Sequence, residues 1–437
     1  MSNATSALPQ WLGSSRFRLI DLARGTDTLG RLTELESIQF ESARDIKRRQ
    51  NNLLDRYVDL VRTSSPLYRG YTDFSQFPVI DKTFAIENRD YLLNPHYKGK
   101  LIRKKTSGSS GQPFVYLTGA DSQSYLWAGI LLSWRVTGYR PGEPVAFLGG
   151  PSFSGPAYVQ RIYYKLLNVQ LFSVFHMSTD KMRAYAEAID RGRFRLLYGY
   201  ASAIHLFALH LLTTPAKHRF ALRAVVCTAE PLTASMRETI EEAFGVPCFN
   251  QYGCNDAGVL AYECEHREGF HLVTTRSYPE VLDDGRFIST DLSNDAFFLP
   301  RYATGDLVRM SGRKCRCGRG FPLIDEVLGR TTDLVSDDAG NVVHASFFTN
   351  LLVQDRRIMA FQVVFDASRL VVVIHCRDAG TGWNGYIDRI RALLAFDPVE
   401  VRENVPFVKS RNGKHAIVLR VEDVQASLAE AARQRAE

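Results

Sequence analysis

The middle of the chain alternates short apolar segments with longer amphipathic ones. Residues 144–150 (PVAFLGG), 195–200 (RLLYGY) and 223–230 (RAVVCTAE) are apolar and end in small or polar residues, which predicts buried strands. Residues 180–190 and 233–245 have the spacing of amphipathic helices, and the second begins with a threonine and ends with a glycine. This alternation predicts an α/β sheet that binds its ligands at the strand ends.

The two flanks of this region have different patterns. Residues 32–64 show helical periodicity with few breakers, which predicts a helix. After Gly329 the pattern changes to short strands such as 370–376 (LVVVIHC), with a helix near 383–395. We therefore expect a separate α+β domain of about a hundred residues at the C-terminal end.

Composition places the chain among ordinary globular proteins. Its 437 residues are 45% hydrophobic and 23% charged, which predicts two or more domains. The longest apolar stretches, 127–134 and 206–212, are too short to span a bilayer. The first twenty residues lack a charged start followed by an apolar core, so no secretory signal and a cytoplasmic location are expected.

Charge and cysteine content narrow the function classes further. The net charge of +7 is spread along the chain, which suits anionic small ligands but lacks the dense basic and aromatic patch of a nucleic-acid-binding protein. The seven cysteines are an odd number and do not form the pattern of a disulfide framework.

Residues 105–113 (KTSGSSGQP) are too polar and flexible for a core. Glycines allow backbone N–H groups to approach an anion, and hydroxyls add donors, so phosphate is the expected ligand; the alternative is a solvated turn. Gln112 stands where a Walker loop would have lysine, and a strand-like segment (PFVYLT) follows. The pattern therefore favours a strand–loop–strand flap over phosphates.

Six motifs in order carry a resemblance to a known family: TSGSSGQP, CTAEPL (227–232), NQYGCNDAG (250–258), RYATGDL (301–307), GRTTDLV (329–335) and NGK (412–414). Together they resemble the AMP-forming adenylate-forming enzymes, the acyl-CoA synthetase superfamily. SSPLYRGY, ECEHREGFH and CRCGRGFPLIDEVLGRTTDL resemble its phenylacetate–CoA ligase branch, and DDAGNVVHASFF (337–348) is similar to the CapK-like members of that branch.

The resemblance implies a domain organisation and a reaction. Residues 1–332 would form an adenylation domain, and residues 333–437 a mobile lid that begins at the hinge residue Asp333. An acid would attack the α-phosphorus of ATP and release pyrophosphate, and the acyl group would then pass to CoA. Lys414 would stabilise the charge that develops as acyl-AMP forms.

The resemblance also implies a set of nucleotide-binding residues. They are Thr106, Ser107, Gly108, Ser109, Ser110 and Gly111 at the phosphates, with Glu230, Pro231, Tyr252, Gly253, Asp306 and Arg330 around adenine and ribose. Asp256 would hold Mg²⁺, although the family usually has Thr-Glu where this chain has Asn255-Asp256; a helix cap is the alternative for Asp256.

Cysteines and histidines cluster in YECEHREGFH and RKCRCGR, and such clusters suit tetrahedral Zn²⁺. The resemblance points to Cys264, His271, Cys315 and Cys317 as ligands of a structural zinc ion, with His266 as a competitor for His271. The alternative is four independent packing or surface residues.

The acid would lie beside the nucleotide, near Phe153, Tyr198, Tyr200, Ser202 and Cys254, which suit an aromatic acid. The same aromatic side chains could instead belong to the core. Two other functions stay open: transfer of the acyl group to an amine, a hydroxyl or a carrier-protein thiol, and a catalytically silent nucleotide-binding homologue. No membrane partner is expected, and the oligomeric state is left open, with a homodimer as one option.

Overall fold

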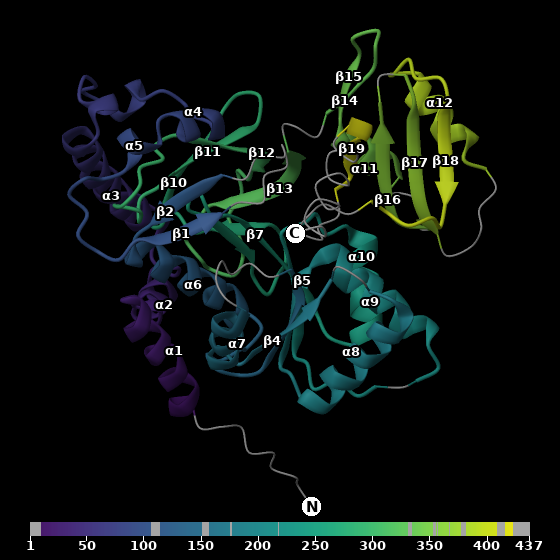
Figure 1. Ribbon diagram of the computed structural model, residues 1–437, viewed down its shortest axis with the longest axis horizontal. Coiled ribbons are helices and arrows are strands. Elements are labelled where there is room, and N and C mark those ends of the chain that lie inside the picture. Colours follow the sequence, from purple (N-terminus) through teal and green to yellow (C-terminus); the bar gives the residue numbers. More distant parts are fainter. Residues whose placement is uncertain are drawn as a thin grey trace, which may run out of the picture.

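The computed structural model describes residues 10–105, 114–150, 157–174, 177–216, 218–330, 334–352, 355, 357–366, 368–376, 382–408 and 416–422. An eleven-stranded sheet, in the order β10-β11-β12-β13-β9-β8-β7-β6-β5-β3-β4, forms the larger unit (Figure 1). Its parallel half consists of β3 (Val145–Gly149), β4 (Val169–Ser173), β5 (Leu196–Tyr200), β6 (Ala224–Thr228) and β7 (Cys248–Cys254).

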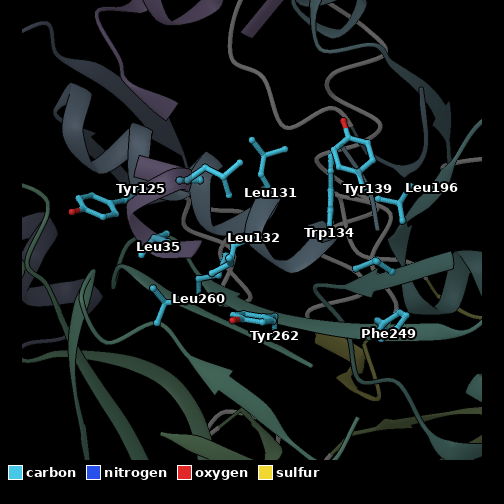
Figure 2. Close-up of a cluster of buried hydrophobic side chains, with 14 of the residues drawn as sticks. Leu35, Tyr125, Leu131, Leu132, Trp134, Tyr139, Leu196, Phe249, Leu260 and Tyr262 are labelled. Atoms are coloured by element: carbon cyan, nitrogen blue, oxygen red, sulfur yellow. The ribbon is translucent and has the colours of Figure 1, made fainter. Parts of the chain in front are cut away.

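The strands of the parallel half are apolar because both faces of the sheet are covered. Side chains alternate between faces along β5: Leu196 joins one core cluster and Leu197 the other. Helices α1 (Gln10–Arg24), α2 (Thr28–Ile38), α6 (Ala120–Arg135) and α7 (Ala157–Leu166) cover the first face, whose cluster Figure 2 shows. Helices α8 (Thr179–Gly192), α9 (Ala201–Thr213) and α10 (Ala234–Phe244) cover the other.

Close backbone packing in this half requires glycine at one position. A Cβ atom on Gly199 would lie 2.1 Å from the carbonyl oxygen of Leu148 on the neighbouring strand β3. Any other residue at position 199 would push these two strands apart. Gly199 therefore allows β5 to pack closely against β3, which also fixes the position of α9, the helix that follows β5 directly.

The second half of the sheet is antiparallel. It contains β8 (Val259–Glu263), β9 (Phe270–Leu272), β10 (Ser277–Val281), β11 (Arg286–Asp291), β12 (Tyr302–Met310) and β13 (Leu323–Arg330). A separate core cluster joins this half to α3 (Ala43–Ser64), η1 (Pro66–Tyr68), η2 (Phe74–Gln76), α4 (Lys82–Glu87), α5 (Arg89–Leu92) and the hairpin of β1 (Ile102–Lys105) and β2 (Val115–Thr118).

A smaller α+β unit follows and lies beside the large one (Figure 1). It has a ribbon of β14 (Leu334–Ser336) and β15 (Val342–His344), helices α11 (Ala345–Leu352) and α12 (Asn384–Arg391), and a sheet of β16 (Ile358–Phe365), β17 (Leu370–Cys376), β18 (Val399–Glu403) and β19 (Val418–Arg420). Its core consists of its own residues, from Val335 to Val418. The predicted fold class, a large α/β domain with a small α+β domain, is confirmed.

Most predicted elements are confirmed, and one needs correction. The predicted helix 233–245 is α10, with Thr233 accepting from the Met236 N–H and Gly245 left-handed at φ +66°. The helical segment predicted over 32–64 is divided into two helices, because the chain breaks between α2 and α3. Ser42 caps α3 by accepting from the Asp45 N–H, and the Gln39 carbonyl before it accepts from Gly320. In the described part of the chain, every helix is too short or too polar to cross a membrane.

Candidate nucleotide site and cysteine–histidine cluster

The carboxyl ends of the five parallel strands meet at one edge of the sheet. Four predicted ligand-binding positions lie at or directly after these ends, as the rule for α/β sheets leads us to expect. Tyr200 is the last residue of β5, Ser202 lies in the first turn of α9, Glu230 follows β6, and Tyr252 lies two residues before the end of β7.

Asp306, Tyr252 and Arg330 form the best-defined part of this edge. The Tyr252 hydroxyl donates to Asp306 Oδ2 at 2.7 Å, and Arg330 Nε lies 3.5 Å from Asp306 Oδ1. Asp306 and Arg330 are register partners on β12 and β13, and the Asp306 side chain is only 11% exposed. Three strands separate β7 from β12 in the sheet order, so the sheet must curl to bring Tyr252 to Asp306.

The protonation of Tyr252 suits this geometry. Burial, together with the charge of Asp306, raises the pKa of the Tyr252 hydroxyl well above its usual value. Tyr252 is therefore a hydrogen-bond donor at neutral pH, and Asp306 an acceptor. A carboxylate has about four lone-pair sites, so Asp306 can still accept further hydroxyl donors.

Asp256 lies in the turn between β7 and β8, where two neighbours donate to it. The Cys254 thiol donates to Oδ1 at 3.0 Å, and the Tyr302 hydroxyl donates to Oδ2 at 3.1 Å. The alternative that Asp256 caps a helix is wrong, because strands flank this turn on both sides. Gly258 closes the turn at φ +69°, and a Cβ atom there would lie 2.6 Å from Cβ of Asp291.

Lys82, the first residue of α4, is a site neighbour that the sequence patterns do not reveal. Burial lowers the pKa of Lys82; the nearby charge of Asp256 opposes this shift, and that of Arg330 adds to it. The lysine is thus close enough to both residues for their charges to act on it. It lies more than 170 residues before Asp256 in the sequence, and no local motif marks it.

Glu230 and Ser202 lie at the strand-end edge of the sheet, whereas the predicted pocket residue Tyr198 lies in the hydrophobic core. Glu230 Oε2 accepts from the Ser202 N–H at 2.9 Å and so holds the first turn of α9. The Tyr198 ring packs 5.1 Å from Trp134, which is labelled in Figure 2, and 5.2 Å from Phe147. Tyr198 is thus a core aromatic, as one of the two interpretations had it, and a contact with an acid stays a prediction.

Several predicted residues lie outside the described part of the chain. They are the phosphate-loop residues Thr106, Ser107, Gly108, Ser109, Ser110 and Gly111, the pocket residue Phe153, the hinge residue Asp333 and the catalytic lysine Lys414. Their roles stay predictions.

Cys264, His271, Cys315 and Cys317 come together at the other end of β8 from Asp256. One ligand atom from each lies within 4.8 Å of the others. The Cys264 and Cys315 sulfurs are 3.6 Å apart, and Cys317 Sγ is 3.3 Å from His271 Nε2. Zn–S bonds of about 2.3 Å in a tetrahedron require S···S separations of about 3.8 Å, so the cluster fits zinc.

The cluster selects between the two candidate histidines. His271, on β9, belongs to it, whereas His266 is not among the four residues. Burial and the nearby Arg319 lower the pKa of His271 to about 4, so its imidazole is neutral at pH 7, as metal binding requires. Cys315 and Cys317 lie between β12 and β13, so the cluster joins two hairpins that are distant in sequence.

Sequence and structure comparisons give consistent relatives. No protein-family model matches the chain. Protein CapK of Staphylococcus aureus is 24% identical over 375 residues, which cover 84% of this chain and 83% of CapK. Phenylacetate-coenzyme A ligase of Thermus thermophilus is 25% identical over 367 residues, 76% of this chain and 80% of that protein.

The fold has a solved counterpart. A crystal structure of 2-hydroxyisobutyryl-CoA ligase in the postadenylation state, in complex with 2-HIB-AMP, superimposes with a TM-score of 0.67 and 19% identity. The match covers 89% of this chain and 93% of that one. The chain is therefore similar in sequence to CapK and to phenylacetate-coenzyme A ligases, and it shares the fold of 2-hydroxyisobutyryl-CoA ligase.

Proposed function

We propose that the protein activates a carboxylic acid with ATP and transfers the acyl group to CoA. The observation that carries the proposal is the Tyr252–Asp306–Arg330 arrangement, three motif residues from separate strands that meet at the ligand-binding edge of the sheet. The sequence relatives, which include phenylacetate-coenzyme A ligases, support the same reaction.

The proposed chemistry has two steps. A carboxylate oxygen of the acid attacks the α-phosphorus of ATP, the bond to the bridging oxygen of the β-phosphate breaks, and pyrophosphate leaves. The sulfur of CoA then attacks the acyl carbon, the thiol proton passes to solvent, and AMP leaves with its phosphate oxygen. Positioning and charge stabilisation contribute most to such reactions.

The described residues have parts in this scheme that follow from their chemistry. Asp306 would accept hydrogen bonds from both ribose hydroxyls, while Arg330 holds the carboxylate in place. Tyr252 would flank adenine, and Glu230 would keep the start of α9 in position. Asp256 offers carboxylate oxygens of the kind that Mg²⁺ prefers, and the ion would neutralise phosphate charge when bound.

The remaining roles in the proposed reaction belong to predicted residues outside the described ranges. Thr106–Gly111 would hold the phosphates, and Lys414 would reach the reacting atoms from the small domain, which would move about the hinge at Asp333. The Cys264–His271–Cys315–Cys317 cluster would bind a structural zinc ion, because four protein ligands leave no open coordination position.

Pyrophosphate release is the direct test. Purified protein with ATP and Mg²⁺ would be offered a panel of aryl, aliphatic and amino acids, each with and without CoA. Release that depends on one acid, with matching CoA consumption, is the expected result, and aryl acids are the expected class.

Other outcomes would contradict parts of the proposal. Acid-dependent release without CoA consumption would favour an amine, a hydroxyl or a carrier-protein thiol as the acceptor. If no acid releases pyrophosphate although the protein binds ATP, the silent homologue would be the better description.

A further inference from the structure

Arg276 is a buried cation with two side-chain nitrogen atoms that have no hydrogen-bond partner in the described part of the chain. It lies between β9 and β10, its side chain is 1% exposed, and it is among the largest fully buried side chains. Its Nε and Nη1 atoms have no hydrogen-bond partner in the described part of the chain. Burying an unpaired cation opposes folding, so its presence needs an explanation.

Asp291 does not account for Arg276. It is the nearest opposing charge, but its carboxylate oxygens bind elsewhere: Oδ2 accepts from Ser122 Oγ at 3.0 Å, and Oδ1 accepts from the Ser293 N–H at 2.9 Å. Neither Nε nor Nη1 of Arg276 donates to it. Nε and Nη1 of Arg276 are therefore left for another acceptor.

A second cation lies close to Arg276. Lys104 stands on β1, next to the last residue of that strand, and its register partner on β2 is Tyr116, which lies near Arg276. Burial, with the charges of Arg24 and Arg276, lowers the pKa of Lys104 to about 8. Lys104 and Arg276 are therefore two cations beside one hairpin. They repel each other unless an anion lies between or beside them.

The location of these cations indicates which anion. The β1–β2 hairpin flanks the predicted phosphate loop, and residues 106–112 of that loop (TSGSSGQ) contain no basic residue. Arg276 also lies near Cys254, whose thiol donates a hydrogen bond to Asp256. A triphosphate bound between these elements would need a counter-charge that the loop itself does not contain.

We infer that Arg276, together with Lys104, supplies the positive charge that binds the polyphosphate of ATP at the β1–β2 hairpin. The inference rests on the proposed function and adds two residues to it. Arginine suits this task because its guanidinium stays charged when buried and offers two parallel donors to phosphate oxygens.

The test compares binding of ATP, AMP and CoA to the full-length protein by calorimetry, without an acid, so that no turnover occurs. In Arg276→Met the Kd for ATP should rise by about tenfold or more, while that for AMP changes by less than about twofold. Arg276→Lys should recover part of the loss, and Lys104→Met should weaken ATP binding in the same selective way. CoA binding should not change.

The melting temperature separates ligand binding from a structural role. Arg276→Met removes an unpaired buried charge while keeping side-chain volume, so the melting temperature should stay the same or rise. The control is Arg237→Met: Arg237 pairs with the buried Glu263 at 2.7 Å, so this variant should melt earlier without affecting the preference for ATP over AMP.

Each remaining outcome would overturn the inference. Equal loss of ATP and AMP affinity in Arg276→Met, with a lower melting temperature, would make Arg276 structural. Unchanged ATP affinity, or a change only for CoA or in the KM of the acid, would assign its charge to another ligand. If the wild-type protein binds no ATP, the proposed function fails together with the inference, whereas wild-type adenylation with an unaffected Arg276→Met variant refutes the inference alone.

Discussion

At the scale of single residues, the carboxylates at the strand-end edge receive hydrogen bonds from neighbouring side chains. Asp306 receives a hydrogen bond from Tyr252 and lies beside Arg330, and Asp256 receives hydrogen bonds from Cys254 and Tyr302. Each of these two carboxylates therefore has its orientation fixed by neighbouring side chains. The edge therefore presents fixed negative oxygens to hydroxyl groups or a cation.

Replacing Asp306 tests this arrangement. Asp306→Asn keeps the shape of the side chain but removes the negative charge that would pair with Arg330 and accept hydrogen bonds from the ribose hydroxyls. A lost hydrogen bond to a charged group is worth about 1.5–3 kcal/mol, so AMP affinity should fall about tenfold to a hundredfold. Calorimetric titration with AMP measures it.

The matched control is Glu326→Gln, which alters a half-exposed carboxylate on the neighbouring strand β13. Its AMP affinity should equal that of the wild type. Equal losses in the two variants would mean that Asp306 acts only through the general charge of the surface.

Asp355 in the small domain predicts a pH dependence of stability. The Arg357 side chain and the Tyr386 hydroxyl donate to its carboxylate and lower the pKa of Asp355 to about 2. Since this pKa lies below the unfolded-state value of about 3.9, the stabilisation is complete above the unfolded value and is lost as the pH falls towards 2.

Asp355→Asn should therefore lower the melting temperature by a few degrees at pH 7, and the difference from wild type should shrink below about pH 4. Thermal melts across this pH range measure it. Asp388→Asn, an exposed change on α12, should show no difference at any pH. A gap for Asp355→Asn that stays constant with pH would show that the charge of Asp355 does not stabilise the fold.

At the scale of elements, hairpins that are distant in sequence are joined in two ways. Backbone pairing joins β13 to β9, with Leu323 opposite His271. Next to this pair, the Cys264–His271–Cys315–Cys317 cluster links the end of β8 to the loop between β12 and β13. The cluster therefore stabilises both β12, which carries Asp306, and β8, which follows the turn that contains Asp256.

Removal of the metal should weaken that support. The wild-type protein should contain zinc by elemental analysis, and a strong chelator should lower its melting temperature, because the metal binds the folded cluster. Cys315→Ser should contain no zinc and should not respond to the chelator.

Cys227→Ala is the control, since Cys227 is buried on β6, away from the cluster. It should keep the zinc even if the core is slightly less stable. Zinc retained by Cys315→Ser would mean that the four residues do not bind it together.

At the scale of the whole molecule, two units with separate cores lie side by side (Figure 1). β16 packs against α10, and a cavity of about 510 Å³ lies between α8, α9, α10 and Cys376 of the small unit. An interface with such a gap is easier to open than a continuous core, which supports our proposal that the small domain moves during the reaction.

In the proposed reaction, the positive charge that stabilises acyl-AMP formation belongs to Lys414 of the small domain. Lys414→Ala should abolish acyl-AMP formation, measured as acid-dependent pyrophosphate release, and leave the melting temperature unchanged, because only a charge is removed. Arg389→Ala, on the exposed side of α12, is the control and should retain full activity. Normal adenylation by Lys414→Ala would refute the assignment.

Local features of this protein could be predicted from its sequence because the interactions behind them are local. Thr233 and Gly245 delimit α10 by bonds within one helical turn, and the apolar run around Leu196 predicts a strand covered on both faces. The ordered motifs predicted the resemblance that the sequence relatives support, and they named Tyr252, Asp306 and Arg330. The break between α2 and α3 was missed because the Gln39 carbonyl binds Gly320, far along the chain.

Only the tertiary structure decided which of these residues meet. The curl of the sheet brings Tyr252 to Asp306, and strand pairing brings His271, not His266, to the three cysteines. Lys82 and Arg276 carry no motif, and their importance comes from burial and from charges on other elements. Sequence determines the local conformation and chemistry of each segment, whereas burial, charge and ligand geometry depend on contacts between segments that are distant in the chain.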